Sequence, residues 1–124
     1  MDPTRPVTNG NNQTEPSNLI FKSNAMDIIG FNYHEYNLGE AFLEKYPGKP
    51  LIITEAVSAL QTRGTYITPA DTEYLWPARW DLPFEREGNE CSAYDNTRAP
   101  WGSTHETTLK EYMAHPWVSG TLDQ

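Results

Sequence analysis

The stretch Leu-Ile-Ile-Thr at 51–54 constrains the fold more than any other part of the sequence. Consecutive apolar and β-branched residues without alternation are typical of a strand buried on both faces of a parallel sheet. A second apolar run stands at 26–33, and a helical pattern at 38–46 ends at the Pro-Gly pair that follows it. Strand, helix and strand at this spacing predict a βαβ unit with a right-handed crossover.

Several short segments extend this pattern. A β-type run stands at 5–8, a short helix is predicted at 18–22, and one more strand is predicted at 117–122. Ser-Thr-His-Glu at 103–106 matches a capping box, in which two orphan backbone donors at a helix start are satisfied. The helix that begins there should end before Pro116.

No hydrophobic period persists from 56 to 102, which predicts a long irregular loop. Such loops are usually functional or disordered, and the aromatic residues of this one argue against disorder. The chain has 124 residues with ten prolines and eight glycines, a composition that suggests a loop-rich α/β piece. A (β/α)8 barrel typically needs roughly 250 residues, about twice this length.

The charge balance narrows the classes of partner. Seventeen acidic residues against nine basic ones give a net charge of -8, which disfavours nucleic acids and anionic membrane surfaces and leaves neutral sugars open. Cys91 is the only cysteine, so no intrachain disulfide is expected. The three histidines, His34, His105 and His115, have no ligand-like spacing, so we expect no protein-bound metal. The first residues lack the pattern of a signal peptide, and no apolar run is long enough to cross a bilayer.

Glu55 is the residue best placed for chemistry. It follows the strand predicted at 51–54, and in parallel α/β folds the carboxyl ends of the strands face the ligand. A carboxylate there is partly desolvated and held on a rigid element. From the residues alone, the alternative is that Glu55 is a solvated glutamate at the end of a strand, without a catalytic role.

Four stretches together resemble glycoside hydrolase family 2, in its bacterial β-galactosidase subgroup. KPLIITEAVSALQTRGTY at 49–66 looks like the family's seventh barrel strand, which presents the nucleophile. DPTRPVT at 2–8 looks like the fifth strand and MDIIGFNYHEY at 26–36 like the sixth. SAYDNTRAPWGSTHE, followed by HPWVSGT, looks like the approach to the eighth. The resemblance implies that residues 1–124 are part of the catalytic (β/α)8 TIM barrel of a larger enzyme, with a long irregular loop after strand seven.

The resemblance implies a retaining glycosidase that cleaves terminal β-galactosides by double displacement. Glu55 would be the nucleophile, and the hydroxyl of Tyr33 would orient its carboxylate; without the resemblance Tyr33 would be a core aromatic. The family's acid/base glutamate lies in an Asn-Glu pair on the fourth strand, N-terminal to everything in this chain. Gly88-Asn89-Glu90 imitates that pair, but no apolar strand precedes it. We therefore expect the isolated chain to be inactive.

Six further residues are candidates for sugar binding. Aromatic rings can stack on the apolar faces of sugars while polar groups bind the hydroxyls. Each tryptophan could instead anchor the loop, Asp95 could cap a turn, and His34 could contact a loop. By strand alternation, Asn32 and His34 cannot both share the face of Tyr33. The candidates are Asn32, His34, Trp76, Trp80, Asp95 and Trp101.

We expect no cofactor within this chain, although Mg²⁺ or Na⁺ could serve a full-length parent. The expected partners are a carbohydrate substrate and the remainder of the barrel, and open strand edges should make the isolated chain self-associate. Two alternatives stay open: a non-catalytic carbohydrate-binding or assembly module, and a related β-glucuronidase or β-mannosidase. The sequence leaves the cellular compartment open, and a full-length bacterial protein that is periplasmic or secreted is one interpretation.

Overall fold

The computed structural model describes residues 2–34, 40–85 and 87–123. The chain forms two compact units. The first unit comprises Met1–Ala56 and Glu111–Gln124, and the second comprises Val57–Lys110. Each is described by itself below.

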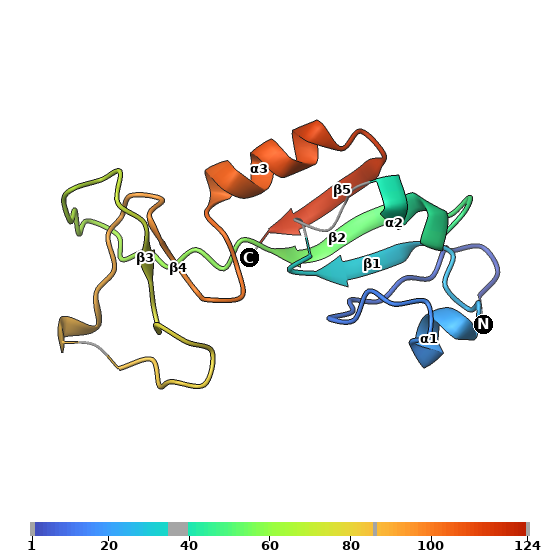
Figure 1. Cartoon of the computed structure of the whole chain (residues 1–124), viewed down its shortest axis with the longest axis horizontal. Helices are drawn as coiled ribbons and strands as arrows, with labels where there is room; N and C mark the ends of the chain where they lie inside the picture. Colours follow the sequence, from blue (N-terminus) through green and yellow to red (C-terminus); the bar gives the residue numbers. More distant parts are fainter. Residues whose placement is uncertain (1, 35–39, 86, 124) are drawn as a thin grey trace. The chain divides into compact units, whose positions relative to one another are not determined.

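A three-stranded parallel sheet forms the centre of the first unit (Figure 1). Its order is β1 (Ile29–Asn32), β2 (Leu51–Ala56) and β5 (Val118–Asp123). The pairing of the run at 26–33 with that at 51–54 confirms the expected parallel neighbours, although β1 is shorter than predicted and β2 extends further. The strand expected at 117–122 is confirmed as β5. The chain is thus a small α/β piece with parallel strands.

The core lies on one face of β1 and β2. Leu51 and Ile53 are buried, whereas the alternate residues Ile52 and Thr54 are partly exposed. The prediction that both faces of this strand are buried is therefore wrong for the described chain, where burial alternates. On the buried side, Phe31 of β1 is completely buried and anchors an aromatic cluster.

Two helices complete this cluster. The Phe31 ring lies 4.8 Å from Phe42 of α2 (Glu40–Lys45) and 5.4 Å from Phe21 of α1 (Leu19–Lys22), measured between centroids. The helix expected at 18–22 is confirmed, with Asn18 Oδ1 accepting the Ile20 N–H at 3.1 Å as its N-cap. Residues 38–39 of the other predicted helix lie outside the described residues. Gly48, at φ 75°, follows α2 as a residue in the left-handed region.

The strand expected at 5–8 is not formed. The Val7 carbonyl accepts the Asp27 N–H at 2.9 Å, and the Asn11 carbonyl accepts the Asn32 N–H at 2.9 Å, so this segment runs beside β1. The Val7 carbonyl also accepts the Ile28 N–H at 3.2 Å, so these bonds fall on only two carbonyls, four residues apart, and do not make a ladder. Pro6 has no N–H to donate. The expected β-type run at 5–8 is therefore wrong as a regular strand, and the identity of this segment as the fifth barrel strand stays a prediction.

The second unit is more ordered than the irregular loop expected from the sequence. It contains a two-stranded parallel sheet of β3 (Tyr74–Leu75) and β4 (Thr97–Arg98) and a short 3-10 helix, η2 (Glu87–Asn89). Distant segments are joined by backbone bonds, such as Leu60 N–H to the Thr97 carbonyl at 2.7 Å. Most of its residues still lie outside regular elements. Local periodicity could not reveal this unit, because its order comes from contacts between remote segments.

Helix α3 (His105–Ala114) ends close to where the sequence indicates, but its cap differs from the expected one. Thr104 Oγ1 accepts the Thr107 N–H at 3.3 Å, so the N-cap is Thr104 and not Ser103. The predicted capping box of Ser103 and Glu106 is therefore wrong, and Ser103 bonds the Thr108 hydroxyl instead. In the part of the chain that the structure describes, no helix has the length and apolar character needed to cross a bilayer.

Candidate active site

Glu55 lies near the carboxyl end of β2, the central strand of the sheet. It pairs with Asn32 of β1 after an irregularity in the register between Phe31 and Asn32. Its carbonyl accepts the Tyr33 N–H at 2.8 Å, and its side chain is half-buried. Glu55 is therefore held on a rigid element at the strand end where the sequence expectation placed it.

Tyr33 contacts the Glu55 carboxylate directly. Its hydroxyl donates to Glu55 Oε1 at 2.7 Å, which confirms the predicted contact between these two side chains. Tyr33 has φ 54°, a left-handed conformation that is uncommon for an aromatic residue and costs about 1–3 kcal/mol. The two bonds to Glu55 hold Tyr33 in this conformation, which departs from the strand geometry of β1.

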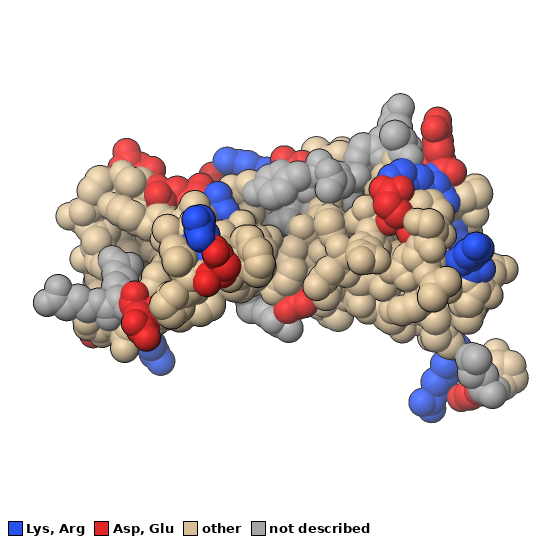
Figure 2. All heavy atoms as spheres, turned by 60° about the horizontal axis from the view of Figure 1, so that its bottom comes forward, with Lys and Arg blue, Asp and Glu red and all other residues tan. Residues whose placement is uncertain are grey.

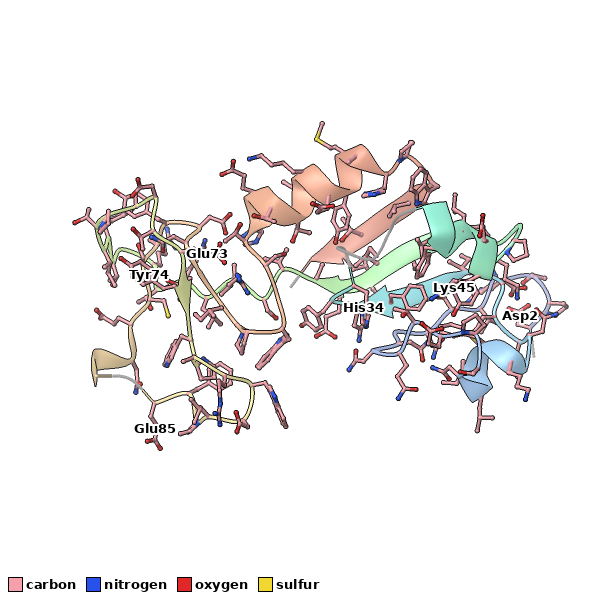
Figure 3. All side chains as sticks on the ribbon, in the orientation of Figure 1. Asp2, His34, Lys45, Glu73, Tyr74 and Glu85 are labelled. Carbon is pink, nitrogen blue, oxygen red and sulfur yellow. The ribbon has the colours of Figure 1, made fainter. Side chains whose placement is uncertain are left out.

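The residues on either side of Tyr33 are engaged by the protein itself. Asn32 Oδ1 accepts the Thr54 hydroxyl at 2.7 Å. His34, beyond the carboxyl end of β1 (Figure 3), places Nε2 2.7 Å from the Asn12 carbonyl. A carbonyl can only accept, so Nε2 carries the proton in this contact. The loop contact expected for His34 is confirmed, and sugar binding by Asn32 and His34 stays a prediction.

The remaining candidates belong to the second unit. Trp76 and Trp101 each lie 5.9 Å from the Phe84 ring, between centroids, while Trp80 is 78% exposed. Trp101 Nε1 donates to Ser58 Oγ at 3.2 Å. Internal contacts thus anchor Trp76 and Trp101, and whether any of these tryptophans borders the Glu55 site stays a prediction.

Asp95 caps α3. Its carboxylate accepts the N–H groups of His105 at 3.1 Å and Glu106 at 2.9 Å, and it lies 2.9 Å from His105 Nδ1. Burial raises the pKa of Asp95, but the hydrogen bonds from Glu106 and His105 outweigh it and hold the pKa below its usual value. The sequence had left capping and substrate binding open for Asp95. The structure shows the cap, and substrate binding stays a prediction.

Glu90 lies in a setting unlike that of Glu55. It follows η2, where Gly88 and Asn89 have φ 76° and 48°, and its side chain is exposed. No strand precedes it between 76 and 89 among the described residues. The described side chains also contain no group of three or more His, Cys, Asp or Glu that could hold a metal ion.

One participant was missed from the sequence. At the register irregularity the Thr54 hydroxyl lies 2.7 Å from Asn32 Oδ1 and 3.1 Å from the Phe31 carbonyl, and its single proton is shared between these two acceptors. Gly10 lies against the same group, because a Cβ there would stand 2.7 Å from Asn32 Oδ1. The position of Thr54 directly before Glu55 was the available signal.

Comparisons with known proteins point to one enzyme class. No family model matches the chain. It is 45% identical over 120 residues to the β-galactosidase BoGH2A of Bacteroides ovatus, a match that covers 97% of this chain and 14% of that protein. It also resembles the crystal structure of a β-glycosidase from Bacteroides vulgatus, with 27% identity and a TM-score of 0.61, over 98% of this chain and 17% of that one. The chain is therefore homologous to a short segment of a Bacteroides family 2 β-galactosidase.

Proposed function

Because the chain is homologous to a segment of a β-galactosidase, we propose that it forms part of the catalytic barrel of a retaining glycoside hydrolase that removes terminal β-galactosides. Glu55 is the nucleophile and Tyr33 orients it. The 2.7 Å bond between Tyr33 Oη and Glu55 Oε1 carries the proposal. It joins two side chains that leave the same end of neighbouring parallel strands, which is where barrel enzymes hold their catalytic groups.

The geometry suits the first step of double displacement. Glu55 attacks the anomeric carbon, the bond to the leaving oxygen breaks, and a covalent glycosyl ester forms. Tyr33 holds one carboxylate oxygen, so the other is free to face the sugar. Water then attacks the ester, returning the carboxylate to Glu55 and releasing the sugar.

Protonation of the leaving group needs a second carboxyl group about 5–5.5 Å from the first. We assign it to a residue outside this chain, since Glu90 is exposed and follows an irregular turn. Any ligands for Mg²⁺ or Na⁺ also come from outside. The isolated chain is then inactive, because general acid catalysis typically contributes 10²–10⁴-fold.

The remainder of the barrel is the partner of this sheet. A shallow pocket of about 150 Å³ lies over β2 and β5, lined by Ile52, Ile53, Gly120, Thr121 and Leu122. Leu122 is 62% exposed. Neighbouring elements of a complete barrel would cover this apolar surface.

A chimera tests the proposal. The 120-residue homologous segment of the B. ovatus β-galactosidase is replaced by this chain, and hydrolysis of a chromogenic β-galactoside is measured. We expect an active chimera whose kcat falls at least about 10³-fold in Glu55→Gln and changes less than about twofold in Glu90→Gln. In Glu55→Gly, added azide should restore turnover and yield an α-glycosyl azide, because azide then bonds to the anomeric carbon in place of the carboxylate.

Three outcomes would contradict the proposal. Equal losses in Glu55→Gln and Glu90→Gln would overturn the nucleophile assignment. A folded chimera that binds galactosides without cleaving them would favour the non-catalytic module. Preference for a β-glucuronide or β-mannoside over the galactoside would overturn the assignment of β-galactosides as the substrate class.

A further inference from the structure

The second unit exposes aromatic rings that a compact unit would normally bury. Trp80 is 78% exposed, Phe84 48% and Trp101 40%. Phe84 lies edge-on between Trp76 and Trp101, with both centroid distances 5.9 Å. Trp80 belongs to the same sequence stretch, four residues after Trp76 and four before Phe84. These four rings are called the aromatic surface.

Ring contacts and a hydrogen bond hold three of these rings, those of Trp76, Phe84 and Trp101. The bond from Trp101 Nε1 to Ser58 Oγ, at 3.2 Å, holds one indole by its polar edge. Trp76 Nε1 is buried and, within the described residues, has no hydrogen-bond partner. An orphaned donor of this kind is uncommon.

A paired arginine and aspartate bracket Trp80. Arg79 donates from Nε to Asp81 Oδ1 at 2.9 Å and from Nη2 to Oδ2 at 2.6 Å. The Leu82 N–H also bonds the Arg79 carbonyl at 3.2 Å. These contacts brace the turn on which Trp80 is exposed. Arg79 keeps further N–H donors and Asp81 keeps further lone pairs beyond this pair.

An aromatic face beside fixed donors and acceptors matches the chemistry of a sugar ring. The C–H face of a pyranose stacks on an indole, while its neighbouring hydroxyls both donate and accept hydrogen bonds. The second unit has eight acidic and five basic side chains, a net charge of -3, which disfavours uronates and sulfated sugars. On the face shown in Figure 2, charged groups are scattered in small clusters among uncharged residues.

We propose that the aromatic surface, with Arg79 and Asp81, is a binding site for a neutral chain of pyranose sugars. The site is additional to the proposed function and does not use Glu55. Trp80 stacks on one sugar ring, Arg79 and Asp81 bind its hydroxyls, and Phe84 and Trp101 contact the next part of the chain.

Binding to the full chain tests this site. β-1,4-Galactotetraose is titrated against the 124-residue chain, its folding checked by near-ultraviolet circular dichroism, with tryptophan emission and calorimetry as readouts. We expect saturable binding that Trp80→Ala weakens at least tenfold and that Arg79→Met also weakens. Tetragalacturonate should bind at least tenfold more weakly. Glu55→Gln and Trp117→Phe should leave the affinity unchanged, since Trp117 belongs to the first unit. If the free chain is not folded, the same variants are measured in the chimera.

Absence of binding by the folded protein would overturn the site, as would affinity that Trp80→Ala leaves intact. Loss of binding in Glu55→Gln would place the sugar at the proposed catalytic site instead. Equal binding of the charged tetramer would overturn the ligand class. Association of the protein without sugar, abolished by Trp80→Ala, would identify the surface as a protein contact. Sugar binding that persists in Glu55→Gln supports this site independently of the proposed function. The proposed function is tested separately, by hydrolysis in the chimera.

Discussion

Tyr33 and Glu55 are joined twice, by a backbone bond of 2.8 Å and a side-chain bond of 2.7 Å. The Tyr33 N–H donates to the Glu55 carbonyl and continues the pairing of β1 with β2. The Tyr33 hydroxyl donates to Glu55 Oε1 and sets the direction of the carboxylate. The two contacts can be separated by mutation, because removing the hydroxyl leaves the backbone bond in place.

Tyr33→Phe in the chimera should lower kcat about 10- to 100-fold and change the melting temperature little. Hydrogen bonds to charged groups contribute about 1.5–3 kcal/mol, and here the loss falls on the orientation of the nucleophile. The matched control is Tyr46→Phe, whose hydroxyl donates to the Thr14 carbonyl at 2.7 Å. It should cost about 1 kcal/mol of stability and leave kcat unchanged. A similar kcat in Tyr33→Phe and the parent chimera would show that the hydroxyl does not orient Glu55.

Gly30→Ala should destabilise the chain by about 1–3 kcal/mol. A Cβ at Gly30 would collide with the Asn9 carbonyl and stand 2.9 Å from Thr54 Cγ2, so the segment beside β1 would be displaced. Gly120→Ala is the control, because a Cβ there meets nothing within 4 Å. Urea unfolding measures the free energy of unfolding of both variants. Equal stability of the two variants would mean that residues 7–11 do not pack on β1.

Asp95→Asn should reduce stability at pH 7 by about 0.5–1 kcal/mol, at the lower end of measured cap effects. The folded pKa of Asp95 is depressed, so its contribution is present above the unfolded value of about 3.9. It is lost as the pH falls through the folded pKa. The variant and the parent should therefore converge in urea unfolding as the pH drops below about 4.

Glu106→Gln serves as the control for this variant. Glu106 lies in the first turn of α3, which Asp95 caps, but its side chain is exposed and forms an ion pair with Lys110. It should change stability by less than about 0.5 kcal/mol. A gap between Asp95→Asn and the parent that persists undiminished in acid would contradict the cap assignment.

The isolated chain should self-associate through β5. Among the described strands β5 pairs only with β2, so no described strand continues the sheet beyond β5 and that side can recruit another chain. The segment at 7–11 already lies beside β1, which makes that edge the poorer candidate. Leu122→Lys should shift the population towards monomer, because a charge on an edge strand opposes pairing. Light scattering that shows a monomer for the parent chain at high concentration would rule this out.

The sequence by itself determined those features that depend on local pattern. The apolar run at 51–54 predicted the central strand, and the helical spacing before it predicted the crossover. The position of Glu55 after that run made it the residue best placed for chemistry, and the resemblance alone gave it the role of nucleophile. Tyr33 was identified through resemblance alone, since its neighbours in sequence do not distinguish it from a core aromatic.

The tertiary structure decided what depends on groups remote in sequence. Tyr33, in its left-handed conformation, bonds Glu55 from twenty-two residues away, and the start of α3 is capped by Asp95 from ten residues upstream. Residues 5–8 look like a strand but do not form one, because their carbonyls meet too few partners beside β1. Periodicity reports which side of an element is apolar. It carries no information on which distant donor meets which acceptor, and those pairings set the geometry around Glu55.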